Sequence, residues 1–394
     1  MANTIVVGKD KVVTSLSKGI ALAQPFDTIL LEKGVYKEGT VILNKPLHLI
    51  GVDEPTLDGE GKNELLIISG RNIVVKGLRL VNAGYSVMND YAAIKVIDAK
   101  NVIVENNTVI NAFFAIHVAN TTYSIVRNNT IKGTPKTEQT SGNGVHLWQC
   151  DNMLVEDNHV EGHRDGIYFE FVTNSVIQNN YSTRNIRYGL HFMFSHYNAY
   201  ISNTFKDNGA GVAVMFSRNV VMHSNLFDHN WGPSAYGILL KEINDARIIH
   251  NTFYQNTAAI VMEGTNRIEV QRNSFTSNGW AMKVQASCDD NTIFNNNFQG
   301  NTFDVTTNGT MMLNKFSGNY WDKYEGYDMN KNGLGDVAYH PVSMYSMVVE
   351  QNPNSLLVLR SFMVSLLDKA EKAIPSLTPE HLKDELPRMK PIQL

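Results

Sequence analysis

The chain is poor in the residues that several common classes of protein depend on. Of its 394 residues only two are cysteine and 18% are charged, and the formal net charge is −4. That charge provides no basic surface for phosphate groups, so binding to nucleic acid is not expected. No stretch reaches the roughly 18 consecutive apolar residues of a membrane-spanning helix, so no membrane span is expected either.

What the chain has instead is a repeat. Asparagines recur along most of the chain, at Asn107, Asn129, Asn158, Asn180, Asn203, Asn225, Asn251, Asn273, Asn296 and Asn314. Most steps are about 22 residues long, and a fixed period of this size indicates a solenoid, in which coils too short to have a core of their own stack on their neighbours. The two longest steps, from Asn129 to Asn158 and from Asn225 to Asn251, predict insertions at 133–141 and around 231–235.

Each repeat reads as short strands around a turn. Val102, Val104 and Val109 alternate with other residues on one face, and period-two alternation indicates strands. A second strand follows each turn and opens with a small residue, such as Gly166 or Gly211. Leucine-rich repeats of similar length need a helix in each repeat, and these repeats do not show one. The sequence therefore predicts a right-handed parallel β-helix.

The repeated asparagines are expected to form a ladder inside this β-helix. Amide side chains one coil apart can hydrogen-bond along the stack at the strand spacing of roughly 4.8 Å. Exposed turn positions are the alternative, but they do not explain why one column keeps asparagine. An earlier coil has Leu78 at this position, so the ladder is expected to begin near Asn107.

Both open ends of a β-helix need a cover. Apolar residues at helical spacing predict a short amphipathic helix over the N-terminal mouth, formed by Val12, Leu16, Ile20 and Ala23. We expect three parts along the chain, namely the β-helix over 1–320, a capping loop over 321–345, and a C-terminal helix with an extended strap over 346–394.

The repeat also places the two cysteines. Cys150 and Cys288 each lie eight residues before a ladder asparagine, and six coils separate them. At roughly 4.8 Å per coil they are on the order of 29 Å apart, far beyond the reach of a disulfide. Both are predicted to be free thiols, so they give no information about the redox compartment.

Stacking sorts the outward side chains into two columns. The first contains Lys95, His117, His146, Tyr168, His191, Ala213, Leu239, Val261 and Lys283. The second contains Ile97, Ala119, Trp148, Glu170, Met193, Met215, Lys241, Glu263 and Gln285. Imidazole and thioether groups are soft ligands that select Cu(I). We therefore consider a copper site drawn from His146, Glu170, His191, Met193, His196 and Met215. A surface shielded by a partner protein is the alternative.

A polysaccharide-binding or polysaccharide-modifying protein, such as a lyase or epimerase, is the alternative function, because β-helices commonly bind glycans along such a face. An enzyme of this kind needs an acid and a base close together, or a basic residue beside calcium-binding carboxylates. Glu170, Lys241, Glu242 and Glu263 are available, but they are spread over several coils. We therefore expect a protein without catalytic residues.

The region after the repeat contains a calcium-loop pattern. Oxygen-bearing side chains alternate, with Gly333 at the sixth position, through Asp328, Asn330, Asn332 and Asp336. The terminal glutamate of an EF-hand is missing. The pattern predicts either a calcium site or a turn, rich in Asn and Gly, that closes the solenoid.

Residues 353–374 change to a helical pattern that is apolar nearly all round. A helix of this length is too short to span a membrane, so it is expected to bind a protein groove or to cap the fold. The expected partner-binding residues are Leu356, Leu359, Phe362, Met363, Leu366 and Leu367.

Several longer runs are more specific than the ladder. They are YGLHFMFS at 188–195, DNGAGVAVM at 207–215, NWGPSAYGILLKE at 230–242, NGWAMKV at 278–284, GNYWD at 318–322, VEQNP at 349–353 and LRSF at 359–362. In these runs the chain resembles the NosD family of nitrous-oxide reductase maturation proteins, over most of its length from about residue 85.

The resemblance implies a periplasmic, non-catalytic β-helix on an ABC transporter made of a membrane permease and a cytoplasmic ATPase. It also implies work with a copper chaperone that supplies copper to nitrous-oxide reductase. On the resemblance, the C-terminal apolar helix docks onto the permease and the His/Met face contacts the chaperone or the enzyme. No signal-peptide pattern precedes the first strand, so the periplasmic location of a mature form is expected on the resemblance alone.

Overall fold

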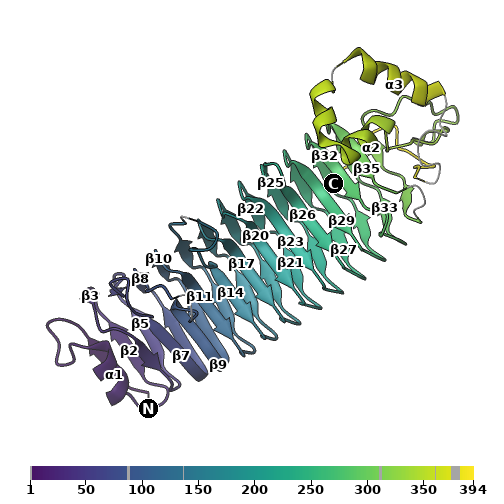
Figure 1. Cartoon of the computed structure of the whole chain (residues 1–394). Coiled ribbons are helices and arrows are strands. Elements are labelled where there is room, and N and C mark those ends of the chain that lie inside the picture. The colour runs from purple at the N-terminus through teal and green to yellow at the C-terminus, as the bar shows by residue number, and fades with distance from the viewer. Residues whose placement is uncertain (1, 87–88, 136, 310–312, 360, 374–381) are drawn as a thin grey trace. The chain divides into compact units, whose positions relative to one another are not determined.

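The computed structural model describes residues 2–86, 89–135, 137–309, 313–359, 361–373 and 382–394. The chain forms two compact units, Met1–Thr204 (unit 1) and Phe205–Leu394 (unit 2). Both units are built as right-handed parallel β-helix, which confirms the fold predicted from the repeat (Figure 1). Among the helices of the described residues, none combines the length and the apolar character that crossing a membrane requires.

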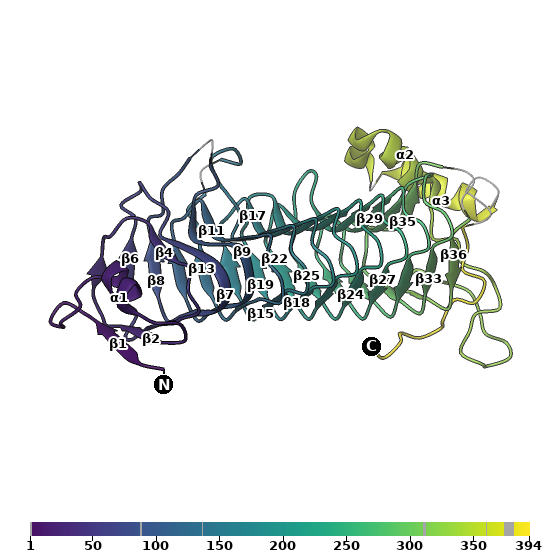
Figure 2. The ribbon, with the colours of Figure 1, turned by 90° about the horizontal axis from the view of Figure 1, so that it is seen from below.

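In unit 1 the helix α1 (Leu16–Leu22) lies between the first two strands of the chain. Its larger sheet contains β1 (Thr4–Val7), β2 (Thr28–Leu31), β4 (Val41–Leu43), β5 (His48–Gly51), β7 (Leu66–Lys76), β9 (Ala92–Glu105), β11 (Phe114–Ala119), β12 (Ile125–Arg127), β14 (Val145–Trp148), β15 (Leu154–Glu156), β17 (Asp165–Glu170), β18 (Val176–Gln178), β20 (Tyr188–Met193) and β21 (Ala199–Ile201). The smaller sheet contains β3 (Val35–Tyr36), β6 (Thr56–Asp58), β8 (Arg79–Val81), β10 (Thr108–Ile110), β13 (Thr130–Lys132), β16 (His159–Glu161) and β19 (Tyr181–Thr183), and β22 (Thr204–Lys206) follows at the unit boundary. Figure 2 shows β15 and β18 side by side, and in their parallel register Val155 faces Ile177.

Unit 2 continues the same arrangement and ends in helices. Its larger sheet contains β23 (Ala210–Met215), β24 (Val221–His223), β26 (Tyr236–Lys241), β27 (Arg247–Ile249), β29 (Ala258–Glu263), β30 (Glu269–Gln271), β32 (Trp280–Val284), β33 (Thr292–Phe294), β35 (Phe303–Thr307) and β36 (Lys315–Ser317). The smaller sheet contains β25 (Leu226–Asp228), β28 (Thr252–Tyr254), β31 (Ser274–Thr276), β34 (Asn297–Gln299) and β37 (Tyr320–Trp321). The helices are α2 (Met344–Gln351), the 3-10 helix η1 (Pro353–Val358) and α3 (Phe362–Ala373).

A file of aromatic rings, one from each coil, fills part of the interior of unit 2. The rings belong to Phe227, Phe253, Phe275, Phe298 and Trp321. Neighbouring centroids lie 4.7, 5.0, 4.7 and 4.0 Å apart, and each pair is nearly parallel. These distances are close to the strand spacing of about 4.8 Å. A side chain of the same size in every coil therefore packs directly on its neighbours.

The small residue that opens the long strand of a coil is required by the close approach of the next coil. A Cβ atom on Gly166 would lie 2.1 Å from Ser182 Oγ and 2.7 Å from the carbonyl oxygen of Gly189. A Cβ atom on Gly211 would lie 2.3 Å from the carbonyl oxygen of Gly237. The recurring glycine is therefore a packing requirement of the stack.

The predicted asparagine ladder is present inside both units. In unit 1 it begins at Asn107, as expected, and runs through Asn129, Asn158, Asn180 and Asn203. Each rung donates its backbone N–H and its side-chain Nδ2–H to Oδ1 of the next; from Asn107 to Asn129 these distances are 3.0 and 3.1 Å. The ladder satisfies polar groups that burial would otherwise leave without partners.

One of the ten predicted rungs is wrong. The ladder of unit 2 runs from Asn225 to Asn296 and then continues to Asn319, not to Asn314. Asn314 instead accepts from the backbone and side chain of Asn291 in a separate file. The short final step, from Asn296 to Asn314, indicated this error, because a rung one coil further on must lie about 22 residues away.

A second ladder in unit 2 was missed at the sequence level. It consists of Asn208, Asn230, Asn256, Asn278 and Asn301. From Asn230 onward its rungs follow those of the first ladder by five residues, as Asn230 follows Asn225. A search for two asparagine files at a fixed offset would have found it.

The N-terminal cap forms with shorter limits than predicted. Helix α1 buries Leu16 and Ile20, and the side chain of Ser15 caps its first turn by accepting from Lys18 N. Glu38 adds a second cap, since its carboxylate accepts from the backbone N–H of Leu16 at 2.6 Å. Val12 precedes the helix and is fully exposed, so its assignment to the apolar face is wrong.

The C-terminal strap, residues 382–394, closes the ladder of unit 2. The buried carboxylate of Asp384 accepts from Asn319 N and Asn319 Nδ2, both at 2.9 Å, and from Trp321 Nε1 at 3.1 Å. Further along, Asn297 exchanges two hydrogen bonds with the backbone of Ile392. Donors that would end the ladder without a partner are thereby satisfied by a carboxylate.

Both cysteines are buried and free, as the repeat predicts. Burial raises the pKa of the Cys150 thiol to about 11. Only the thiolate is a strong nucleophile or metal ligand. Cys150 is therefore a packing residue and adds nothing to the set of copper donors.

Candidate functional site

The first outward column of unit 1 forms a continuous file of rings. The strands β11, β14, β17 and β20 align His117, His146, Tyr168 and His191 as the alternation predicts. Neighbouring ring centroids lie 4.9, 4.7 and 4.9 Å apart, all edge to face. We call these four residues the imidazole column. Each ring is thereby supported by the ring one coil away, an arrangement that aromatic quadrupoles favour.

Burial keeps the imidazoles of His117 and His146 neutral. It lowers the pKa of His117 to about 4, and it lowers the pKa of His146 well below the ordinary value, with the neighbouring His117 adding to the effect. His117 Nδ1 has no hydrogen-bond partner within the described structure, and neither ring nitrogen of His191 makes a well-formed one. A neutral imidazole with a free lone pair is the form that binds metal ions.

A buried carboxylate lies beside the end of the imidazole column. Asp165 Oδ2 is 3.5 Å from His191 Nδ1, a long contact, and Arg187 Nε donates to Asp165 Oδ1 at 2.8 Å. Burial opposes ionisation of Asp165, but the hydrogen bonds and positive charge of Arg187 hold its pKa below the usual value. Arg187 also lies 3.4 Å from Glu138, which belongs to the predicted insertion at 133–141.

The second outward column brings Glu170 and Met193 together on β17 and β20. The hydroxyl of Tyr168 is 3.2 Å from Glu170 Oε2 and 3.8 Å from Met193 Sδ. Burial and the adjacent Glu170 raise the pKa of Tyr168, so its hydroxyl stays protonated and acts as a donor. His146, Glu170, His191 and Met193 are thus grouped around one tyrosine.

The remaining two predicted copper ligands lie elsewhere. His196 follows the end of β20 and is aligned with Thr173 at a turn, outside both columns. Met215 belongs to unit 2, where it is aligned with Lys241. Within its own unit, its column continues with hard or cationic groups, Lys241 and Glu263.

The donor atoms of unit 1 suit a soft ion better than a hard one. Among the described residues, no group of three or more His, Cys, Asp or Glu is arranged to hold a metal ion. What the described part of unit 1 does provide is imidazoles, with no hydrogen-bond partner at His117 Nδ1 or His191 Nε2, and the thioether of Met193. These are ligands for Cu(I).

The predicted calcium loop is folded on itself. The carboxylate of Asp328 accepts from the backbone N–H groups of Asn332 and Gly333, at 3.1 and 2.8 Å. Asp336 accepts from Met329 N at 2.7 Å and from Asn330 Nδ2 at 3.2 Å. The loop is exposed and its oxygens already have donors, so the turn alternative accounts for every contact. Calcium binding stays a prediction.

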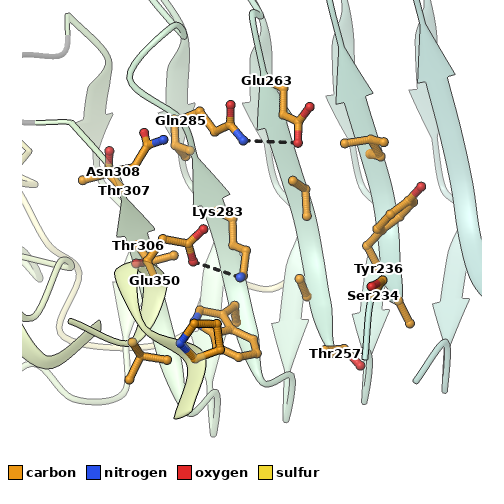
Figure 3. Close-up of a pocket in the computed structure, with 18 of the residues that line it drawn as sticks. Ser234, Tyr236, Thr257, Glu263, Lys283, Gln285, Thr306, Thr307, Asn308 and Glu350 are labelled. Atoms are coloured by element: carbon orange, nitrogen blue, oxygen red, sulfur yellow. Dashed lines mark hydrogen bonds and ion pairs between the residues drawn. The ribbon is translucent and has the colours of Figure 1, made fainter. Parts of the chain in front are cut away.

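In unit 2 the same outward face is partly covered by the C-terminal helices and encloses a cavity of about 390 Å³ (Figure 3). Lys283 Nζ is 2.9 Å from Glu350 Oε2 and 4.2 Å from the centroid of the Trp280 ring. Gln285 Nε2 donates to Glu263 Oε1 at 3.2 Å. Both carboxylates therefore have partners within the described residues.

The C-terminal helices have one packed side and one exposed side. A cluster on β35, α2 and α3 is formed by Phe303, Tyr345, Val349 and Val364. Three of the predicted partner-binding residues pack against this cluster, namely Leu356, Leu359 and Leu367. The other three, Phe362, Met363 and Leu366, are exposed by 81, 61 and 50%, and Leu357 is exposed by 91%. Figure 1 shows α2 beside β35.

Comparison with known proteins gives a family. A family model described as "Periplasmic copper-binding protein (NosD)" matches residues 128–326. A protein of Pseudomonas aeruginosa named "Probable ABC transporter binding protein NosD" is 30% identical over 373 residues, which cover 89% of this chain and 86% of that protein. The chain belongs to the NosD family. A protein of Stutzerimonas stutzeri with the same name is 27% identical over 382 residues, covering 91% of this chain and 86% of that protein.

Solved structures share the fold at low identity. The A-module of the Azotobacter vinelandii mannuronan C-5 epimerase AlgE6 covers 78% of this chain and 95% of its own, with a TM-score of 0.62 and 14% identity. The catalytic unit of a Streptomyces thermodiastaticus α-1,3-glucanase covers 78% of this chain and 65% of its own, with a TM-score of 0.62 and 13% identity. Both show the β-helix alone. The NosD relatives are named as binding proteins, and the family is described as periplasmic.

Two residues beside the imidazole column were missed at the sequence level. Asp165 is the first residue of β17 and Arg187 directly precedes β20, and a charged residue at the start of a strand reads as part of a turn. A signal was present, because Asp165 stands one coil before Tyr188 in register, directly beside Arg187. Charge pairing across one repeat would have indicated the ion pair.

Proposed function

We propose that this protein is the periplasmic scaffold of an ABC transporter complex that matures the copper sites of nitrous-oxide reductase. It receives copper from a chaperone and presents the metal to the acceptor enzyme. Membership of the NosD family supports this function, and so do the relatives named as ABC transporter binding proteins. The transporter permease and its ATPase are the proposed partners at the C-terminus.

The observation that carries the proposal is the exposed apolar side of the C-terminal helices. Phe362, Met363 and Leu366 are held in place because the opposite side, including Leu359 and Leu367, is anchored to the β-helix of unit 2. Large exposed apolar groups on an anchored helix mark a binding surface for a groove on another protein. The permease is the proposed owner of that groove.

The dock is tested by replacing Phe362, Met363 and Leu366 together with Ser. Because these side chains are exposed, the β-helix should keep its melting temperature, while co-purification with the permease and ATPase should be lost. The matched control is Leu313→Ser, which removes another exposed apolar side chain of unit 2. The dock is contradicted if the triple variant co-purifies with the permease and ATPase as well as the wild type does.

The proposed path of copper lies on the outward face of unit 1. His146, His191, Glu170 and Met193 surround Tyr168. Imidazole and thioether groups are soft donors, so this face can receive a Cu(I) ion carried in by another protein. His196 and Met215 remain candidate ligands further along the chain. Copper is the cargo here, and the donor groups bind and release it without chemistry of their own.

Copper transfer from the loaded chaperone tests this path. The double variant His191→Phe with Met193→Leu keeps the size of both side chains but removes two soft donors. It should accept less copper than the wild type accepts, because two of its soft donors are gone. Met262→Leu, in the core of unit 2, is the matched control. Unchanged stoichiometry and transfer rate would contradict the copper path.

Polysaccharide binding or modification remains the alternative function, because structures with the same fold include an epimerase and a glucanase. Against it, Glu263 and Glu350 at the cavity of unit 2 are bonded to Gln285 and Lys283. Turnover on a panel of acidic polysaccharides would favour this alternative over the scaffold.

A further inference from the structure

Two phenylalanines in unit 1 stand at the surface in a backbone conformation that does not suit them. Phe171 follows β17 and Phe194 follows β20, and they are 45 and 37% exposed. Their φ angles are 54° and 50°, in the left-handed region. Bulky side chains rarely adopt this region, which favours Gly and Asn. The chain therefore accepts both a backbone cost and an exposed apolar surface at these turns.

The β-helix itself does not require phenylalanine at these turns. The corresponding turn residues of the two preceding coils are Asn120 and Gln149, with φ angles of 48° and 51°. Asparagine is the residue best suited to this conformation after glycine. The turn therefore forms without an aromatic side chain, so the backbone does not require the exposed rings of Phe171 and Phe194.

The geometry of the two rings restricts what they can bind. Their centroids are 5.3 Å apart and their planes differ by 9°, so the rings stack on each other across neighbouring coils. The face of each ring is therefore turned toward the neighbouring coil, and the ring edges are left for contact with a partner. Sugars bind aromatic residues through ring faces, whereas ring edges attract thioether sulfur and the faces of other aromatic rings.

The chemistry around the stack indicates charge on the partner. Phe171 and Phe194 directly follow Glu170 and Met193 of the second outward column. Glu170 and the nearby Asp151 form no ion pair within the part of the chain that the structure describes, although Asp151 accepts hydrogen bonds from Thr173 and Asn174. A surface with an apolar centre and carboxylates without counter-charges is complementary to an apolar surface bordered by cations.

We propose that the Phe171–Phe194 stack is the docking surface for the copper-carrying chaperone, which contacts it through methionine or aromatic side chains beside basic residues or its bound metal. This inference rests on the proposed function, since it names the surface by which the chaperone is received. Docking here brings the chaperone next to Met193 and Glu170, at the soft donors of unit 1. The stack binds the protein, and the donors bind the metal.

The test is the double variant Phe171→Asn with Phe194→Asn. Asparagine relieves the backbone strain, so the melting temperature should be equal to or higher than that of the wild type. Affinity for the Cu(I)-loaded chaperone, measured by biolayer interferometry, should fall about tenfold or more, because exposed aromatic anchors dominate such interfaces. Affinity for Cu(I) itself, measured by competition with a chelator, should stay within about twofold.

A matched control separates docking from a general loss of exposed aromatic surface. Tyr123 is 54% exposed and has a φ angle of 52°, but it lies at a different turn of the coil. Tyr123→Asn should leave chaperone binding unchanged. The proposal is overturned if the double variant binds the chaperone as the wild type does, or if Tyr123→Asn loses binding equally.

Two other outcomes discriminate further. If the wild type binds oligosaccharides of alginate or polygalacturonate and the double variant does not, the stack is a glycan surface and the proposal fails. If the wild type binds no copper-loaded chaperone at all, both the proposed function and the docking surface fail. Equal chaperone binding by wild type and double variant contradicts the docking surface alone.

Discussion

The same outward column carries different chemistry in the two units. In unit 1 its members are His117, His146, Tyr168 and His191, which pack edge to face on one another. In unit 2 they are Ala213, Leu239, Val261 and Lys283, and three of these line the cavity below the C-terminal helices. Inside the coils the units are alike, since each contains an asparagine ladder.

This difference separates what the repeat dictates from what it leaves free. Inward positions must match the same position one coil away, because each side chain packs or bonds to its own equivalent. Outward positions meet only solvent or whatever covers the face, so they can change from imidazole to aliphatic without affecting the backbone. Function is therefore expected on outward columns, and stability inside.

The largest expected effect tests the claim that the interiors are alike. Asn158 of unit 1 and Asn273 of unit 2 each have four side-chain hydrogen bonds to ladder and backbone groups. Replacing either with Ala leaves buried donors and acceptors without partners, and should lower the free energy of unfolding by roughly 4 kcal/mol. Guanidinium denaturation followed by circular dichroism measures it. Exposed Asn354→Ala is the control, and very different losses in the two units would break the comparison.

The next effect tests the claim that the outward faces differ. The pKa of folded His117 is lowered to about 4 from 6.5, so the unfolded chain takes up the proton first as the pH falls. The stabilisation is fully present above pH 6.5 and is lost between pH 6.5 and pH 4. From pH 7 to 4.5 the wild type should lose about 2 kcal/mol at this position.

The variant His117→Phe should lack that part of the pH dependence, measured by denaturation at both pH values. The control is His48→Phe, at an exposed position, which should keep the pH dependence of the wild type. If the pH profile of His117→Phe equals that of the wild type, His117 is protonated in the folded chain, contrary to its burial.

The smallest effect concerns the helices that cover the face of unit 2. Lys283 and Glu350 join β32 to α2, and each side chain is 25% exposed. Pairs this close to solvent contribute little, so Glu350→Gln should cost about 0.5 kcal/mol or less. Limited proteolysis after α2 should be only slightly faster than in the wild type. Release of the helices by this single change would show that the ion pair, not the cluster around Phe303, holds them.

The sequence predicted the fold because the fold consists of local repeats. A period of about 22 residues, strand alternation and one asparagine per coil determine the stack, its register and its columns. The same logic identified Asn107 as the first rung. It failed at Asn314, where the step departed from the period and the physical requirement of one coil per rung was not applied.

The candidate site was less predictable, because it depends on contacts that the repeat does not specify. His146, His191, Glu170 and Met193 were found from their columns, whereas Tyr168 and Asp165 acquire their roles through ring stacking and an ion pair. Leu356, Leu359 and Leu367 read as free apolar residues, since the sequence does not show that the β-helix itself covers them.

The ladder of unit 2 has a direction, because every rung donates toward the C-terminus and Asp384 accepts last. Any rung can therefore be exchanged for any other: excising 252–273 would leave Asn251 facing Asn296 with the same donors and acceptors. The length of such a protein can therefore change only by whole coils, with Asp384 still accepting from the last asparagine. Deletion of half a coil would instead place a residue other than asparagine opposite the next rung.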